Sequence, residues 1–167
     1  MTLTGGERVV RNQTCCFTGH RIIPPDQLNE VQERLKKAIL SSIHAGYRYF
    51  GAGGALGFDT LAAQQVLSLK KDFPNIKLIL VLPCKSQTRG WDQDDIDVYE
   101  RIKSSADKVV YTSENYYSGC MHKRNRHLVD NSSLCICYLT ENSGGTHYTV
   151  QYAEQNALDI VNVAVNG

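Results

Sequence analysis

The sequence lacks several features that would assign it to a simple class. It has no apolar run of the roughly 18 residues that span a membrane, and residues 1–13 contain no apolar core of a signal peptide. We therefore expect a soluble, cytoplasmic protein with no membrane partner. The 18 Lys and Arg residues nearly balance the 17 Asp and Glu residues. Because the net charge is only +1, no overall field attracts nucleic acid, and any anion must be held locally.

Metal-binding and disulfide motifs are also missing. The sequence contains no CxxC or HExxH motif, and its six cysteines are scattered. His122 and His127 are five residues apart, off the spacing that places two ligands on one helix face. Cys135 and Cys137 alternate along an apparent strand, which is typical of buried core thiols. We expect no metal, no cofactor and no disulfide scaffold.

Apolar runs and helical patterns alternate along the 167 residues, and this is typical of βαβ units around a parallel sheet. Strands are predicted at residues 14–18, 47–51, 76–82, 108–112, 134–139 and 160–165. Helices are predicted from residues 24–26 to Gly46, at about 55–71, 95–104 and 120–130, and after residue 146. The pattern predicts one α/β domain over residues 14–167, with three layers, a Rossmann-like, mainly parallel sheet and helices on both faces. Residues 1–13 are predicted to form a flexible N-terminal segment.

Glycine-rich segments follow three of the predicted strands, at residues 17–21, 51–59 and 143–146. In an open parallel sheet, ligands bind outside the carboxyl ends of the strands. Glycine allows a positive φ and a close approach of backbone N–H groups to an anion, and a helix N-terminus adds partial positive charge. Each segment alone fits a tight turn equally well. Three together favour one binding site.

The second segment is not a dinucleotide fingerprint. Gly51 and Gly53 would need a third glycine where Leu56 stands, and Asp59 comes too early to meet a ribose hydroxyl in the usual way. Ordinary NAD chemistry is therefore disfavoured. Asp59 is either a first-turn carboxylate stabilised by its helix or a polar group that faces the ligand.

Basic residues occur at two places that a ligand could reach. His20 and Arg21 directly follow the first strand, where they either contribute to the site or lie in a solvated loop. Arg124 and Asn125 belong to the densest basic patch, which is either a solvated helix face or a source of planar donors beside the sheet.

Three aromatic residues leave alternatives open. Trp91 lies in a polar loop after the third strand, where it either covers the pocket or anchors the loop to the body. Tyr148 and Tyr152 are one helical turn apart and line either a homo-oligomer interface or a covered core edge.

The strand-end motifs together resemble the YpsA-like family of the SLOG superfamily, bacterial Rossmann-like proteins associated with nucleotide-derived ligands. The resemblance rests on residues 17–21, 53–59, 124–130 and 143–146 in that order. It implies a parallel sheet with the ligand across the ends of the first, second and fifth strands. It does not imply a reaction.

Two related families point to different functions. The cytokinin-activating phosphoribohydrolases carry a glutamate three residues beyond the threonine of the glycine-glycine-threonine turn, where this chain has Thr149. A hydroxyl cannot replace that general base near neutral pH, so the same hydrolysis is in doubt. The bacterial DNA-processing protein shares the glycine turn and the Arg-Asn pair, but it binds single-stranded DNA through more positive charge than this sequence offers.

We expect this protein to bind or sense a small, nucleotide-like ligand at the glycine-rich strand ends. The predicted ligand-binding residues are Thr18, Gly19, His20, Arg21, Gly53, Gly54, Gly57, Asp59, Arg124, Asn125, Gly144, Gly145 and Thr146. A competing hypothesis is hydrolysis of a nucleotide-derived molecule, with Asp59 or Glu154 as the carboxylate and His20 assisting. Binding of single-stranded DNA is a weaker alternative.

Overall fold

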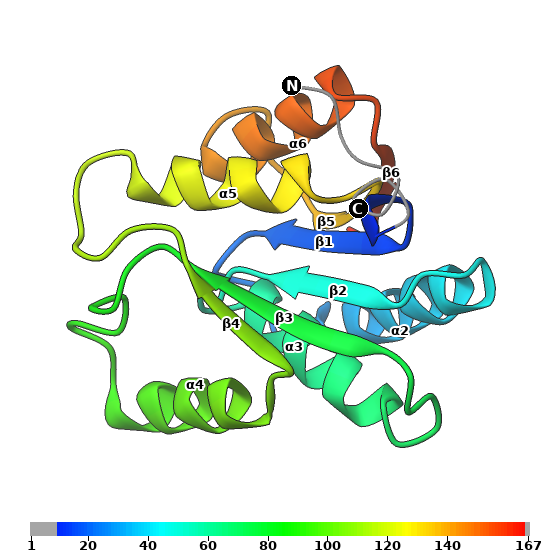
Figure 1. The fold of residues 1–167 in the computed structure, drawn as a ribbon, viewed down its shortest axis with the longest axis horizontal. Coiled ribbons are helices and arrows are strands. Elements are labelled where there is room, and N and C mark those ends of the chain that lie inside the picture. The colour runs from blue at the N-terminus through cyan, green and yellow to red at the C-terminus, as the bar shows by residue number, and fades with distance from the viewer. Residues whose placement is uncertain (1–9, 166–167) are drawn as a thin grey trace.

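Parallel strands form the centre of the computed structural model, which describes residues 10–165 (Figure 1). The strands are β1 (Thr14–Gly19), β2 (Tyr49–Ala52), β3 (Lys77–Leu82), β4 (Lys108–Tyr111), β5 (Leu134–Tyr138) and β6 (Asp159–Asn162). The helices are α2 (Leu28–His44), α3 (Phe58–Leu69), α4 (Gln93–Ser105), α5 (Cys120–Asp130) and α6 (Gly145–Gln155). Over this range the sheet order is β4-β3-β2-β1-β5-β6, and every pair is parallel. The predicted Rossmann-like α/β fold is confirmed.

Two hydrophobic layers cover the sheet (Figure 1). Phe17, Phe50 and Leu80 face α2, α3 and α4, and Cys16 and Cys135 face α5 and α6. Side chains of successive strand residues point to opposite faces, so each buried strand contributes to both layers.

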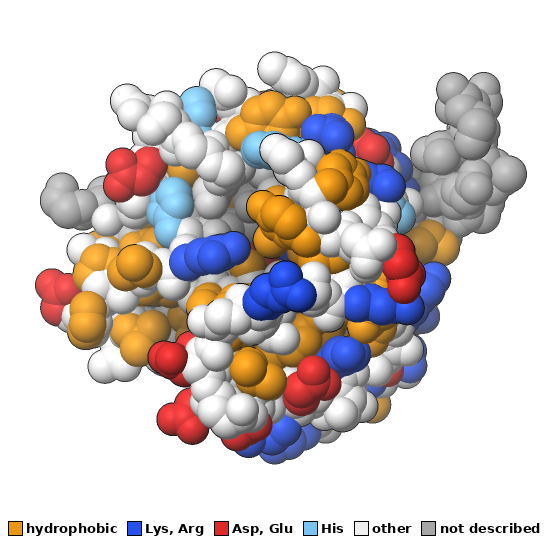
Figure 2. All heavy atoms as spheres, turned by 90° about the vertical axis from the view of Figure 1, so that its left-hand side faces the viewer, with side chains coloured by type: hydrophobic (Ala, Val, Ile, Leu, Met, Phe, Trp, Pro, Cys, Tyr) orange, Lys and Arg blue, Asp and Glu red, His pale blue; other side chains and the backbone are white. Residues whose placement is uncertain are grey.

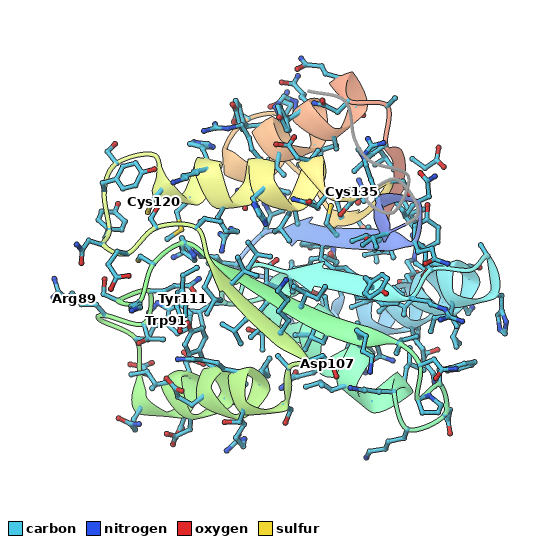
Figure 3. All side chains as sticks on the ribbon, viewed as in Figure 1. Arg89, Trp91, Asp107, Tyr111, Cys120 and Cys135 are labelled. Carbon is cyan, nitrogen blue, oxygen red and sulfur yellow. The ribbon has the colours of Figure 1, made fainter. Side chains whose placement is uncertain are left out.

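All six cysteines are free and buried, as expected for core thiols. Cys16 and Cys135 lie opposite each other in the β1–β5 register, and Figure 3 labels Cys135 beneath α5. Burial raises the pKa of the Cys137 thiol to about 12. The buried thiols thus act as packing groups in the interior.

The helix boundaries differ from the predicted ones where turn geometry decides them. Gly57 has a φ of 78°, so α3 begins at Phe58 rather than near residue 55. Pro24 and Gln27 form a turn before α2, with the Gln27 N–H bonded to the Pro24 carbonyl at 2.9 Å.

The predicted flexible segment lies outside the described residues up to residue 9. Its end is helical at residues 10–12, and the Gln13 N–H donates to the Val10 carbonyl at 3.0 Å. At the other end of the predicted domain, residues 166–167 also lie outside the described part.

The strand order shows where the chain changes direction. From β1 the chain adds strands outward to β4, and it then returns to place β5 on the other side of β1. The crossover direction reverses at β1 and β5, which is where open α/β sheets form ligand sites.

Candidate ligand-binding site

A crevice of about 420 Å³ opens at the carboxyl ends of β1 and β5. The predicted residues that line it are Thr18, Gly19, His20, Arg21, Asp59, Arg124, Asn125, Gly144, Gly145 and Thr146. Figure 2 faces the carboxyl ends of the strands and shows Lys and Arg side chains near the middle of this surface. The fold thus brings four sequence segments to one hollow, because parallel strands end at the same edge of the sheet.

Arg124 is the buried cation of the crevice. Its side chain is 4% exposed, and its Nε donates to the Asn125 Oδ1 at 2.7 Å. One Nη donates to the Gly53 carbonyl, and the other has the weakly accepting Met121 sulfur at 3.7 Å. One face of the guanidinium group is therefore fixed, while Nη2 keeps donor capacity for a ligand.

Asp59 provides a buried carboxylate of the crevice, in the first turn of α3. It accepts a hydrogen bond from the Ala55 N–H at 3.3 Å and is 6% exposed. Burial raises the pKa of Asp59 to about 6, against the opposing charges of Arg124 and Arg21. Both readings of its sequence position apply, since Asp59 stands in the first turn and also lines the crevice.

Asp59 and Arg124 do not form a direct ion pair. Within the described residues, the charged pairs that approach within 4.0 Å involve other side chains. Two buried groups of opposite charge thus share a hollow without touching. A ligand group that donates to the carboxylate and accepts from the guanidinium would satisfy both.

The N-terminus of α6 supplies backbone donors. Gly144 caps the helix with a φ of 94°, and a Cβ added at Gly144 or Gly145 would meet nothing within 4 Å. Thr149 is buried and donates its hydroxyl to the Gly145 carbonyl at 2.9 Å, so it serves the helix rather than the crevice. Open first-turn N–H groups with the helix dipole behind them favour an anion.

His20 is held as a neutral ring. Its Nε2 accepts the Thr140 N–H at 2.9 Å, and the ring packs edge-on against Tyr138 with centroids 5.6 Å apart. Burial lowers the pKa of His20, although Glu141 opposes this shift. The neutral tautomer therefore carries its proton on Nδ1, which makes that atom a donor.

The glycines after β2 are not among the residues that line the crevice, and a role of their N–H groups in holding the ligand stays a prediction. A Cβ at Gly53 would lie 2.6 Å from the Arg124 guanidinium, and one at Gly57 would lie 2.1 Å from the Arg21 carbonyl oxygen. Gly54 has a φ of 73° and faces Leu82 instead. These glycines let Arg124 and the loop after β1 pack closely.

Other predicted residues lie away from the crevice. Glu154 is exposed on the last turns of α6, so the structure does not place it beside His20 and Asp59. Trp91 packs edge-on against Tyr99 with centroids 5.6 Å apart, and it anchors its loop to α4 (Figure 3). Tyr152 donates its hydroxyl to Asp130 at 2.7 Å, and Tyr148 packs on His122 with centroids 4.6 Å apart. Both tyrosines therefore cover α5.

Sequence reasoning missed several residues of the crevice. Glu141, Ala55 and Met121 line it without belonging to the predicted set. Glu141 follows the predicted fifth strand, and that position at a strand end was a usable signal. A second hollow of about 630 Å³ shares His20, Arg21 and Glu141 with the crevice, and Ile22 and Pro24 form part of its wall. The two hollows thus adjoin at the loop after β1.

Two features of the described residues concern metal ligands and membrane-spanning helices. No group of three or more His, Cys, Asp or Glu side chains in it is arranged to hold a metal ion. Among the helices between residues 10 and 165, none has the length and apolar character needed to cross a bilayer.

Solved structures confirm the fold. DNA processing protein A from Helicobacter pylori superposes over 94% of this chain and 67% of its own, with a TM-score of 0.62 and 16% identity. Its structure was described for a single-stranded DNA binding mode. DNA processing protein A from Streptococcus pneumoniae matches over 95% of this chain with a TM-score of 0.65 and 15% identity. The present chain spans 52% of that protein.

Sequence relatives extend the comparison. A UPF0398 protein of Brevibacillus brevis is 26% identical over 130 residues, which is 76% of this chain and 69% of the relative. The SPbeta prophage-derived protein YoqJ of Bacillus subtilis is 31% identical over 124 residues, 67% of this chain and 72% of the relative. The YspA SLOG family profile matches residues 24–164, and the chain belongs to this family.

Proposed function

We propose that this protein binds a nucleotide or nucleotide-derived ligand through its phosphate groups in the crevice at the ends of β1 and β5. The observation that carries the proposal is the meeting of the buried Arg124 with the open N-terminus of α6 in one hollow. A cation and free backbone N–H groups are complementary to phosphate oxygens.

The remaining groups suit the neutral part of such a ligand. Asp59 and Glu141 accept hydrogen bonds from sugar hydroxyls or an exocyclic amine, and the His20 Nδ1 donates one. The adjoining hollow gives a base or a second ring room beside Ile22 and Pro24. We infer that the phosphate lies at α6 and the rest of the ligand extends toward the loop after β1.

Substitution of Gly145 tests this orientation. Gly145→Asp places a carboxylate at the proposed position of the phosphate. A negative charge at a helix N-terminus is stabilised by the helix dipole, so the variant should still fold. The matched control Gly145→Ala adds a methyl group in open space and keeps the N–H groups. In a thermal-shift screen at about 100 times Kd, a true ligand stabilises the wild type by about 2.7 kcal/mol. The Asp variant should lose this shift and the Ala variant should keep it; no shift with any nucleotide contradicts the proposal.

Hydrolysis of the bound molecule is a second candidate function. The pKa of Asp59, about 6, lies close to neutrality, and such a carboxyl group can exchange protons during a reaction. Asp59→Asn should then abolish turnover while the thermal shift by the nucleotide persists. Turnover that survives this substitution removes Asp59 as the acid or base.

Binding of single-stranded DNA is favoured by the fold shared with DNA processing protein A. Lys123 is exposed on α5, the helix that also carries Arg124, and would add a phosphate contact. Fluorescence anisotropy with an oligothymidylate at two salt concentrations tests this function, because phosphate contacts give a steep salt dependence. An affinity for the oligothymidylate that does not change with salt concentration contradicts this function. So does the absence of binding at 50 mM salt.

A further inference from the structure

The free edge of the sheet carries an inference that is independent of the crevice. We propose that two copies of this chain associate through β6, pairing antiparallel about a two-fold axis at Val161. In the described residues no strand pairs with the outer edge of β6. An open edge presents unpaired N–H and C=O groups, which form a template for another strand.

The hydrogen-bond directions fix the register of this pairing. The Asp159 N–H donates to Ser133 at 3.1 Å and the Val163 N–H donates to Cys137 at 2.9 Å, so alternate residues point toward β5. Ile160 and Asn162 therefore point their backbone groups outward. In an antiparallel pair about Val161, Ile160 of one copy exchanges hydrogen bonds with Asn162 of the other, and the two Val161 side chains meet.

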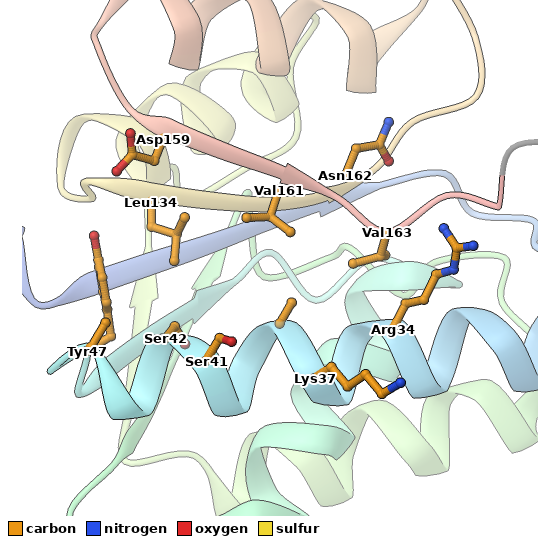
Figure 4. Close-up of a pocket in the computed structure, with 12 residues that line it drawn as sticks. Arg34, Lys37, Ser41, Ser42, Tyr47, Leu134, Asp159, Val161, Asn162 and Val163 are labelled. Atoms are coloured by element: carbon orange, nitrogen blue, oxygen red, sulfur yellow. The ribbon is translucent and has the colours of Figure 1, made fainter.

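The position of the Val161 side chain is consistent with this register. Val161 is 39% exposed over a groove of about 610 Å³ that runs between β6 and α2 (Figure 4). Ala38, Leu134 and Val163 supply apolar surface to the groove. The Val161 side chain of a second copy would fill its middle.

The charges at the two ends of the groove are opposite in sign, so the grooves of two antiparallel copies are complementary. Asp159 lies at one end (Figure 4). Arg34, which pairs with Glu30 at 3.0 Å, lies at the other end with Lys37 on α2. Arg34 donates to the Ala164 carbonyl at 3.0 Å, so the basic end is the carboxyl end of β6. Antiparallel pairing brings the Asp159 of each copy to the Arg34 and Lys37 of the other, which favours a second copy of this chain as the occupant.

The other edge of the sheet lacks this character. Strand β4 begins with the exposed Lys108, and Lys85 and Lys103 both lie 5.9 Å from the Tyr111 ring centroid. Lysine on an edge strand disfavours pairing, and β6 has none. Of the two edges of the described sheet, β6 is therefore the one better suited to pair with a partner strand.

Cysteine cross-linking tests the register. The native cysteines are all buried, so a thiol introduced by Val161→Cys would react without competition. Directly opposed residues of a non-hydrogen-bonded pair have Cα atoms about 4.5 Å apart, within disulfide range. Mild oxidation of the Val161→Cys variant should give a covalent dimer. The control variant Lys36→Cys should give no covalent dimer, because Lys36 is exposed on α2 but lies outside the groove.

Sedimentation equilibrium and a charge exchange complete the experiment. The wild-type protein should sediment with twice its 18.7 kDa mass. Lys37→Glu and Asp159→Lys should each weaken association on the order of tenfold, and the double variant should recover most of it. Lys36→Glu is the matched control and should leave association unchanged. A wild-type monomer at several hundred micromolar, no cross-link through Val161→Cys, or a double variant weaker than either single one overturns the proposal.

Discussion

The crevice at the ends of β1 and β5 and the groove along β6 are both hollows beside unpaired backbone groups, but they suit different partners. The crevice surrounds the α6 N-terminus with buried charges, Arg124 and Asp59. The groove places Val161 between charges at its two ends. Convergent donors at a helix terminus fit a compact anion, whereas a row of donors and acceptors along an edge fits another strand. Under the two proposals, the same sheet offers one site for a small molecule and one for a second chain.

The largest effect that would separate these regions is expected for Arg124→Met. Loss of the buried cation leaves the Gly53 carbonyl with only the 3.3 Å hydrogen bond from Gln87, and it removes the larger of the two opposite charges that act on Asp59. We expect a cost of about 3 kcal/mol. Urea unfolding at pH 7.5 measures the loss, and it should shrink at pH 5, where Asp59 is protonated. Lys123→Met, exposed on the same helix, should change stability by less than about 0.5 kcal/mol. An equal loss at both pH values would contradict the link to Asp59.

A smaller loss is expected for Gly57→Ala. The new methyl group would lie against the backbone of Arg21, and the φ of 78° disfavours any side chain. We expect a loss of about 2 kcal/mol in the free energy of unfolding, together with weaker nucleotide binding. The dimer should be unaffected, since β6 lies away from this turn. Gly46→Ala, which has a φ of 102° and open space around it, isolates the conformational part of the cost.

The pH dependence of stability sharpens the comparison further. The folded-state pKa of Asp59 is raised from 3.8 to about 6, so between these values the folded protein binds a proton that the unfolded chain has released. The contribution of Asp59 to stability therefore falls as pH rises through this window, by at most about 1.4 kcal/mol per pH unit. Urea unfolding from pH 3.5 to 7 should show the fall in the wild type. An identical profile for Asp59→Asn would refute the assignment.

The smallest effect is expected for Glu154→Gln. Glu154 is exposed outside the crevice, so nucleotide affinity should stay within about twofold and stability within about 0.5 kcal/mol. Calorimetric titration measures the nucleotide affinity of this variant and of Asp59→Asn for comparison. A large loss of turnover in the Glu154 variant would instead support Glu154 as the catalytic carboxylate.

Much of this arrangement could be predicted from sequence, because local patterns determine it. The β-branched runs and the order of glycine turns predicted the sheet and most of the residues at its carboxyl ends. Position on the helix predicted that Arg124 lies beside the sheet, and the structure buries it to 4% exposure.

Contacts between distant residues could not be predicted in this way. Gly53 lacks a side chain because Arg124, 71 residues later, packs against it, and no local pattern reports such a pair. The tyrosines of α6 showed an amphipathic spacing, but only the position of α5 decides which side chains they contact. The strand pattern predicted β6 without indicating that it ends the sheet, since strand order depends on the crossover after β4.

The loop after β1 is hydrogen-bonded on both sides, and under the proposed function this has a consequence for the kinetics of ligand binding. The Phe58 N–H donates to the His20 carbonyl at 3.1 Å, and the His20 ring accepts the Thr140 N–H at 2.9 Å. The loop is thereby joined to α3 and to the segment after β5 before any ligand arrives. A site assembled in advance needs no closing step, so the observed association rate should rise linearly with ligand concentration and show no plateau.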